Sequence, residues 1–262
     1  MPKKKLIFIA GPCVIENKAQ TLKIASFLKR TVSKLPVQFI FKASFDKANR
    51  TSLKSFRGPG LTKGIKILEE VKKKFKIPIL SDVHCVEQVK YLKDILDVIQ
   101  IPAFLCRQTD LILEAAKAKK TINIKKGQFL APEDVKHIVE KVESTGNKKI
   151  FITERGSCFG YNNLVVDFRS FLIMKKFGYP VIFDVTHSLQ RPCAAGGISG
   201  GDREYASYLA KAAIACGVDG LFMEVHPNPK KAKSDKYTSY PLGKIGDLLK
   251  KILKIRKIAT SK

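Results

Sequence analysis

The stretch LIFIAGPCVIE, Leu6 to Glu16, begins with a short apolar run that ends at a Gly-Pro pair. A run of this length, rich in Ile and Phe, is typical of a buried strand. A doubly wound sheet usually has a Gly-rich phosphate loop after its first strand, and GPCVIE lacks the G-x-G-x-x-G spacing. The stretch therefore favours a closed barrel over an open sheet, provided that similar strands follow.

Seven similar runs do follow. They are FIFKAS from Phe39, PILSDV from Pro78, VIQIPA from Val98, TINIKK from Thr121, KIFITER from Lys149, PVIFDVT from Pro180 and GLFMEVH from Gly220. Segments with helical spacing lie between them, including Val71 to Phe75, Val86 to Leu96 and Val135 to Val142. A last apolar stripe runs from Leu242 to Leu253 and is able to close an outer ring of helices. This alternation predicts a (β/α)8 TIM barrel with a closed parallel sheet, formed by residues 1–262 as a single domain.

The net charge is +26, from 49 Lys and Arg against 23 Asp and Glu. Such an excess suits a protein that handles anionic metabolites or one that binds nucleic acid. Most of the lysines lie in helix-like stretches such as EEVKKKF, LEAAKAKK and LLKKILKIRK, which favours a solvated, lysine-biased surface. A basic barrel that binds nucleic acid is the alternative from another class, and a salt-dependent association with DNA or RNA would reveal it.

The six cysteines, at positions 13, 85, 106, 158, 193 and 216, contain no CxxC pair. Most of them lie in or beside apolar runs, so buried or functional thiols are expected rather than a disulfide framework. The apolar run in KKKLIFIAGP stops after five residues, too short for a signal peptide or a membrane span. We therefore expect a cytoplasmic protein that does not associate with membranes.

Polar residues stand at the carboxyl end of every predicted strand, where TIM barrels place their active sites. These residues are Cys13, Lys42 with Ser44, Asp82, Gln100, Lys125, Arg155, His187 and Glu224. A single lysine in such a place usually just reaches water, but eight convergent polar ends indicate an active site.

The stretch FKASFDKANRTS, Phe41 to Ser52, is unusually rich in cations and hydroxyls. Ser44, Asn49, Arg50 and Thr51 are of the residue types that bind phosphate and sugar hydroxyls. The pattern indicates an anionic sugar ligand at this end of the barrel.

Eight motifs together resemble the 3-deoxy-D-manno-octulosonate 8-phosphate synthases, also called 2-dehydro-3-deoxyphosphooctonate aldolases. The motifs run in order from Leu6 to Asp235 and read GPCVIE, FKASFDKANRTS, FRGPG, QIPAFLCRQTDL, NIKKGQF, TERGSCFGYNNLVVDFRS, FDVTHSLQ and FMEVHPNP. The resemblance implies a transferase of lipopolysaccharide sugar biosynthesis that condenses phosphoenolpyruvate with D-arabinose 5-phosphate and water. The runner-up is the related 3-deoxy-D-arabino-heptulosonate 7-phosphate synthase, which shares GPC but has a different loop in place of KANRTS.

The resemblance also implies roles for single residues. The phosphoenolpyruvate ligands would be Lys42, Ser44 and Lys47 near the carboxylate, Lys125 and Arg155 at the phosphate, and Gln100 and the backbone amide of Ala103. The arabinose 5-phosphate ligands would be Asn49, Arg50, Thr51 and Arg107. In the family this last arginine reaches into a neighbouring subunit's site, which implies a homotetramer. The catalytic residues would be Cys13, Lys47, Asp82 and His187.

Cys13, His187, Glu224 and Asp235 match the metal ligands of one branch of the family, whereas the metal-independent branch has asparagine at the cysteine position. A thiolate, an imidazole and two carboxylates suit a borderline divalent ion such as zinc, iron or manganese. The resemblance therefore implies a metal-dependent enzyme. For each residue taken alone, a packed thiol, a hydrogen-bonded histidine or a loop carboxylate is the ordinary alternative.

Two positions depart from the family pattern. Cys85 replaces the usual glutamate after SDVH, and Ser81 replaces the usual threonine. Asp82 is retained, so we expect the reaction to be kept, with a different network around His84.

Overall fold

A computed structural model describes residues 5–195 and 198–260. Its sheet contains β1 (Leu6–Gly11), β2 (Val37–Lys42), β3 (Ile79–Asp82), β4 (Val98–Ile101), β5 (Thr121–Lys125), β6 (Ile150–Glu154), β9 (Val181–Asp184) and β12 (Gly220–His226). These strands pair in parallel in this order, and β12 pairs in parallel with β1. The sheet is therefore closed, and each of the eight predicted runs overlaps one of its strands, although β2 begins at Val37, before the predicted run from Phe39. The predicted TIM barrel is confirmed.

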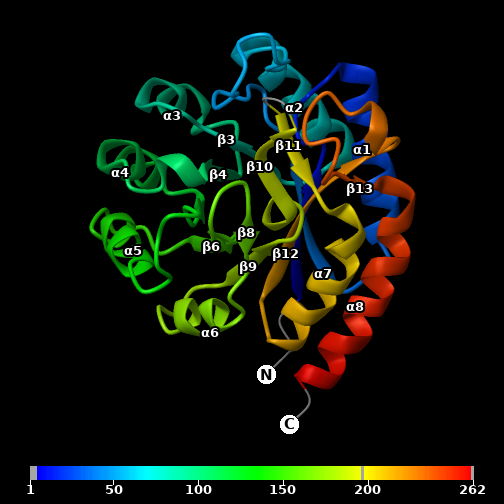
Figure 1. Cartoon of the computed structure of the whole chain (residues 1–262). Coiled ribbons are helices and arrows are strands. Elements are labelled where there is room, and N and C mark those ends of the chain that lie inside the picture. The colour runs from blue at the N-terminus through cyan, green and yellow to red at the C-terminus, as the bar shows by residue number, and fades with distance from the viewer. Residues whose placement is uncertain (1–4, 196–197, 261–262) are drawn as a thin grey trace.

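The helices lie around the outside of the barrel in chain order (Figure 1). They are α1 (Lys18–Val32), α2 (Leu61–Phe75), α3 (Val86–Leu92), α4 (Thr109–Lys117), α5 (Val135–Glu143), α6 (Arg169–Lys175), α7 (Ala206–Ala215) and α8 (Ile245–Ala259). Single 3-10 turns occur at Ala103–Leu105, His187–Leu189, Arg203–Tyr205, Pro229–Lys231 and Leu242–Lys244. The stripe predicted from Leu242 thus begins in a 3-10 turn and continues in α8.

The predicted helix from Val86 to Leu96 was too long, since α3 ends at Leu92. The backbone N–H groups of Ile95 and Leu96 both donate to the Leu92 carbonyl, which makes a tight turn toward β4. Leu96 is nevertheless fully buried. The apolar pattern therefore extends beyond the end of the helix, because the turn that follows also packs against the core.

Five short strands in loops were not predicted. They are β7 (Ser157–Cys158), β8 (Leu164–Val165), β10 (Gln190–Ala195), β11 (Ile198–Gly201) and β13 (Tyr240–Pro241). The pairs β7–β8 and β10–β11 are antiparallel, and β13 lies parallel to β12. The β10–β11 hairpin lies in front of the barrel strands in Figure 1. These pieces shape the loops that follow β6, β9 and β12.

The two-residue period of the strands decides which side chains point into the barrel. The apolar interior cluster consists of Ile7, Ile9, Ile40, Leu80, Val98, Ile182 and Phe222. Two residues further along five of these strands, the side chains are Lys42, Asp82, Gln100, Asp184 and Glu224. Because successive side chains alternate between the faces of a strand, these polar groups continue the inward row. They form a polar layer above the apolar interior, at the carboxyl ends of the strands.

Gly11 ends β1 at a point where the backbones of β1 and β2 approach closely. A Cβ atom at this position would lie 1.9 Å from the Lys42 carbonyl oxygen. A side chain would therefore push β2 away and displace Lys42 from the polar layer. The close approach of the two backbones thus requires glycine at this position of the GPC motif.

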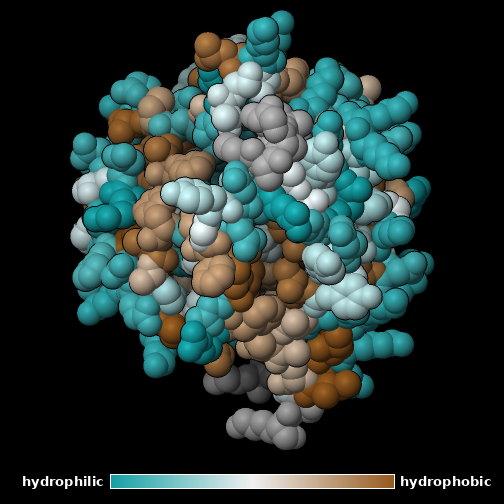
Figure 2. All heavy atoms as spheres, in the orientation of Figure 1, coloured by the Kyte–Doolittle hydropathy of each residue, from teal (hydrophilic) through white to brown (hydrophobic). Residues whose placement is uncertain are grey.

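The outer surface agrees with the solvated helix faces predicted from the sequence. Lys73 and Lys74 of α2 and Lys250 and Lys251 of α8 are all exposed. On the face drawn in Figure 2, hydrophilic residues predominate around the periphery, and apolar residues gather in the lower part of the view. In the part of the chain that is described, none of the helices combines the length and the apolar character needed to cross a membrane.

Candidate active site

A cavity of about 650 Å³ opens at the carboxyl ends of the strands. The predicted site residues that line it are Lys42, Lys47, Asn49, Arg50, Thr51, Asp82, Gln100, Ala103, Lys125, Arg155, His187 and Asp235. Cys13, Ser44 and Glu224 are buried beside it, and Arg107 is exposed outside it. The structure thus brings nearly all of the predicted residues into one place.

Lys125 reaches into the cavity from the end of β5 and forms an ion pair with Asp184 of β9. Asp184 also lies 2.8 Å from Nδ1 of His187, through its Oδ2 atom. Burial lowers the pKa of Lys125, although the charge of Asp184 opposes this shift. Burial would raise the pKa of the Asp184 carboxyl, but the charges of His187 and Lys125 outweigh this effect and hold that pKa well below its ordinary value. The ammonium group of Lys125 on the cavity wall is therefore backed by a buried carboxylate.

Arg155 follows β6 and is buried beside the same wall. Its Nη2 atom donates to Oε1 of Gln190 at 2.6 Å and to the His187 carbonyl at 3.3 Å. Its Nε atom is buried and has no hydrogen-bond partner among the described residues. A buried guanidinium with an unused donor is suited to an anionic ligand, because leaving that donor unpaired costs about 1 to 3 kcal/mol.

Lys42 and Lys47 approach Glu224 from β2 and from the loop after it. The Nζ atom of Lys42 donates to Oε1 of Glu224 at 2.8 Å, and that of Lys47 lies 3.6 Å from the same oxygen. Burial alone would lower the pKa of Lys47, but the negative groups around it, including Glu224 and Asp82, raise it well above its ordinary value. Lys47 therefore keeps its positive charge at neutral pH.

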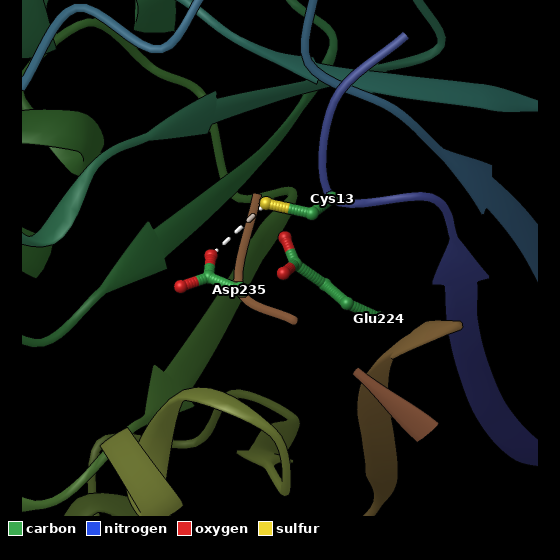
Figure 3. A group of neighbouring side chains, drawn as sticks. All are labelled: Cys13, Glu224 and Asp235. Carbon is green, nitrogen blue, oxygen red and sulfur yellow. Dashed lines mark hydrogen bonds between the residues drawn. The ribbon is translucent and has the colours of Figure 1, made fainter. Parts of the chain in front are cut away.

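Cys13, Glu224 and Asp235 offer one ligand atom each within 4.8 Å of one another (Figure 3). The Cys13 thiol donates to Oδ2 of Asp235 at 3.0 Å, and burial together with the two carboxylates raises its pKa well above the ordinary value. Oε2 of Glu224 is buried without a partner in the described chain. One thiol and two carboxylates converging around an unsatisfied oxygen have the donor set of a divalent metal site.

His187, the fourth predicted ligand, stands at the edge of this cluster. Its Nε2 atom lies 3.5 Å from Oε1 of Glu224 and 3.9 Å from Oδ2 of Asp235. Its Nδ1 atom faces Asp184, which fixes the orientation of the ring. The arrangement matches a metal-ligating imidazole whose other nitrogen is held by a carboxylate.

The departure at Cys85 leaves the neighbouring ion pair in place. Nε2 of His84 lies 3.0 Å from Oδ2 of Asp82, and its Nδ1 lies 3.1 Å from Oε1 of Gln88. The Cys85 side chain is exposed at the start of α3 and makes no capping hydrogen bond. The two nitrogen atoms of the His84 ring therefore face Gln88 and Asp82, and Cys85 takes no part in that network. The hydroxyl of Ser81 is buried without a described partner.

The Gln100 side chain is held in place by a chain of two hydrogen bonds that passes through Asn123 to Thr153. Nδ2 of Asn123 donates to its Oε1 at 3.0 Å, and the Thr153 hydroxyl donates to Oδ1 of Asn123 at 2.6 Å. The N–H groups of the Gln100 amide therefore take no part in this contact with Asn123. The Ser44 hydroxyl is buried and unpaired among the residues described.

The segment KANRTS forms the rim of the cavity. Asn49 and Thr51 are exposed, while Nε of Arg50 donates to the Phe56 carbonyl at 3.1 Å. Nη2 of Arg50 is buried with no partner within the described chain. The rim therefore offers a second guanidinium donor in addition to Arg155.

Several residues of the site were not singled out from the sequence. Asp184 lies in a predicted strand, two residues after the inward-facing Ile182, so the strand period was a signal for it. Gln190 lies six residues beyond the end of β9, where no periodicity applies. Lys126 and Glu154 form a buried ion pair with 3.5 Å between Nζ and Oε1. Their positions, beside Lys125 and Arg155, gave no indication of that contact.

Barrel closure, a cation-lined cavity at the strand ends and an adjoining thiol and carboxylate cluster define a TIM-barrel protein with a candidate metal site beside that cavity. Comparison with known sequences specifies the class, since the chain belongs to the DAHP synthetase I family, whose model matches residues 2–260.

Curated relatives are named 2-dehydro-3-deoxyphosphooctonate aldolase. The one from Desulfatibacillum aliphaticivorans is 56% identical over 255 residues, which cover 97% of this chain and 93% of the relative. That from Geotalea daltonii is 57% identical over 249 residues, covering 95% and 92%. The Fusobacterium nucleatum protein is 53% identical over 256 residues, covering 98% and 92%. The family resemblance predicted from the motifs is confirmed.

Proposed function

We propose that this protein condenses phosphoenolpyruvate with D-arabinose 5-phosphate and water, giving 3-deoxy-D-manno-octulosonate 8-phosphate and inorganic phosphate. The observation that carries the proposal is the set of cations in one cavity, with Lys47, Lys125 and Arg155 on its walls and Arg50 on its rim. Two substrates with three anionic groups between them need such a set. The names of the relatives support the same reaction.

Phosphoenolpyruvate fits the inner part of the cavity. Its phosphate would bind Lys125 and the unused Nε donor of Arg155, while its carboxylate would bind Lys47, with Lys42 and Ser44 beneath. Gln100 and the Ala103 amide would complete the pocket. Fixing both anionic ends orients the enol carbon, and such positioning is a large part of the catalysis of a reaction between two bound substrates.

In the reaction, the enol carbon of phosphoenolpyruvate forms a bond to the aldehyde carbon of the sugar. A water oxygen adds to the adjacent carbon, and the bond from that carbon to the bridging oxygen breaks, so that this carbon becomes a ketone and phosphate leaves with the bonding electrons. One proton of the water ends on the former aldehyde oxygen, which becomes a hydroxyl, and the other ends on the departing phosphate. Lys47 would stabilise the negative charge that develops on the aldehyde oxygen. Asp82 remains ionised, since His84 and Lys47 outweigh the effect of burial and hold its pKa far below the ordinary value. It is therefore a charged hydrogen-bond acceptor that would orient the attacking water.

Cys13, Glu224 and Asp235, with His187 beside them, fit a divalent zinc, iron or manganese ion. Such an ion would supply a Lewis acid next to the reacting atoms. The thiol has to lose its proton to become a ligand, and burial together with the two facing carboxylates raises the pKa of Cys13, a shift that the charge of a bound cation would oppose.

The choice of aldose tests this proposal against the runner-up. Purified protein given phosphoenolpyruvate should release phosphate with arabinose 5-phosphate at least tenfold faster than with erythrose 4-phosphate. The KANRTS rim, with its buried Arg50 donor, is the reason for this expectation. A phosphate-release assay with each aldose decides the question, and a preference for erythrose 4-phosphate would favour the seven-carbon synthase.

We propose the homotetramer implied by the family, with Arg107 reaching into a neighbouring subunit's site. Arg107 follows the turn at Ala103–Leu105 and lies outside the cavity, where its side chain is free to reach a neighbouring subunit. Replacing it by alanine should raise KM for arabinose 5-phosphate about tenfold or more and leave KM for phosphoenolpyruvate nearly unchanged. Steady-state kinetics with each substrate varied check this expectation. Equal increases in both constants would contradict a role in sugar phosphate binding.

The free thiols of Cys13, Cys85, Cys106, Cys158 and Cys216 support the reducing, cytoplasmic location predicted from the sequence.

A further inference from the structure

The Gln190 amide joins the two halves of the candidate site. Gln190 begins β10, directly after the turn that carries His187. Its Oε1 atom accepts a hydrogen bond from Nη2 of Arg155 at 2.6 Å, and its Nε2 atom donates to Oδ1 of Asp235 at 2.7 Å. One side chain therefore links the cation assigned to the phosphate with a carboxylate of the metal cluster.

These two partners specify the residue type. A guanidinium can only donate hydrogen bonds and an ionised carboxylate can only accept them, so the amide oxygen must face Arg155 and the amide nitrogen must face Asp235. A glutamate at position 190 would repel Asp235, and a lysine or arginine would repel Arg155. An apolar side chain would leave both groups short of a partner. Among side chains of this length, only glutamine satisfies both.

The bridge rests on a firmly packed backbone. Gln190 pairs with Gly201 across the β10–β11 hairpin. A Cβ atom at Gly201 would lie 2.2 Å from Cγ2 of Thr238, so the base of the hairpin sits directly on the turn that follows Asp235. In that turn the Thr238 and Ser239 amides donate to the Asp235 carbonyl.

Asp235 itself has a left-handed backbone conformation, with φ of 48°. Such a conformation is uncommon for a residue other than glycine and persists where the surroundings enforce it. Gln190 holds Oδ1 of this residue, which leaves Oδ2 facing the Cys13 thiol at 3.0 Å. The same amide holds Nη2 of Arg155 and leaves the Nε donor of that residue without a described partner.

We propose that Gln190 is a positioning residue that couples the metal cluster to the phosphate-binding wall. This inference rests on the proposed function, since it takes a divalent ion at Asp235 and phosphoenolpyruvate at Arg155. A ligand bound at either place fixes the conformation of the shared Gln190 amide. The second ligand then binds without the loss of conformational entropy that fixing this amide requires. Coupling of this kind is reciprocal, so each ligand tightens the binding of the other by the same factor.

Calorimetry on protein stripped of metal by chelation tests the coupling. Zn²⁺ is titrated with and without saturating phosphoenolpyruvate, and phosphoenolpyruvate is titrated with and without Zn²⁺. The wild-type protein should bind each ligand several-fold more tightly when the other is present. In Gln190→Met the Zn²⁺ affinity should fall about tenfold or more, the cost of losing a hydrogen bond to a charged group, and the coupling factor should fall to one.

Gln190→Glu provides a second variant, which keeps an acceptor for Arg155 but loses the donor to Asp235. It should lose the coupling as well. Gln38→Met is the matched control, because Gln38 is exposed on β2, and its coupling should equal that of the wild type. Thermal melting establishes that each variant is folded. If either folded Gln190 variant keeps the coupling factor of the wild type, the inference about Gln190 is overturned while the proposed function stands. A wild-type protein that binds neither ligand overturns the proposed function and the inference with it.

Discussion

Exhaustive chelation is expected to abolish the condensation of phosphoenolpyruvate with arabinose 5-phosphate, and an added divalent metal should restore it. Without a cation, Glu224 and Asp235 face each other and a protonated thiol across a cluster in which Cys13 and Glu224 are buried and Asp235 is half-buried. The carboxylates then repel one another, and Oε2 of Glu224 lacks a partner among the described atoms. Elemental analysis before and after chelation, combined with a phosphate-release assay, checks this expectation.

Replacement of Cys13 separates a metal ligand from a packed thiol. Cys13→Ala should bind metal poorly and retain less than about a tenth of the activity, since even the loss of a residue that only supports a ligand costs a metal site about 10- to 100-fold. Cys13→Asn should keep a small activity that no longer responds to chelator, because an amide can donate a hydrogen bond where the ion stood.

Cys216→Ala is the matched control for these variants. Cys216 is a half-buried thiol that follows α7, outside the residues that line the cavity. Its variant should lose activity on chelation and regain it with metal, as the wild type does. A wild-type protein that contains no metal and is fully active after chelation would show that Cys13 is only a packed thiol.

Removing either cation from the phosphate wall should weaken phosphoenolpyruvate binding by about one to two orders of magnitude. Lys125→Ala and Arg155→Ala each remove a charge-assisted contact worth about 1.5 to 3 kcal/mol, which corresponds to an affinity loss of about 10- to 150-fold. The loss for Lys125→Ala should be the larger, because Asp184 would lose the ammonium group beside it and its negative charge would be less compensated near the incoming phosphate. Calorimetric titration with phosphoenolpyruvate measures both effects.

Lys149→Ala is the matched control for these two variants. Lys149 is exposed immediately before β6, at the opposite end of that strand from Arg155, so its loss removes the same charge without touching the cavity. Phosphoenolpyruvate affinity in this control should equal that of the wild type. Wild-type affinity in both cavity variants would remove Lys125 and Arg155 from the binding site.

Most of the site was predictable because the strand period carries the information. The apolar runs located all eight barrel strands, and the residues at their carboxyl ends included Lys42, Asp82, Gln100 and Glu224, which lie in the polar layer. A residue's place in a strand determines its face, and the parallel closed sheet brings all of the carboxyl ends to one mouth. The same period would have located Asp184.

Other features depend on contacts that no local pattern encodes. The ends of helices depend on turns such as the one after Leu92, and the short strands β7, β8, β10 and β11 lie in irregular loops. The pairing of Lys125 with Asp184 joins residues 59 positions apart, and the Gln190 bridge to Asp235 spans 45. Such contacts exist only once barrel closure has brought the loops together.

The sequence by itself therefore determined the barrel, the order of its strands, the end that carries the site and the family to which the chain belongs. The tertiary structure alone decided which charges neutralise one another, that Arg107 lies outside the cavity, and that Gln190 connects Arg155 with Asp235. The physical reason is that periodicity is a property of a single strand or helix, whereas a hydrogen bond between loops depends on the geometry of the whole closed sheet.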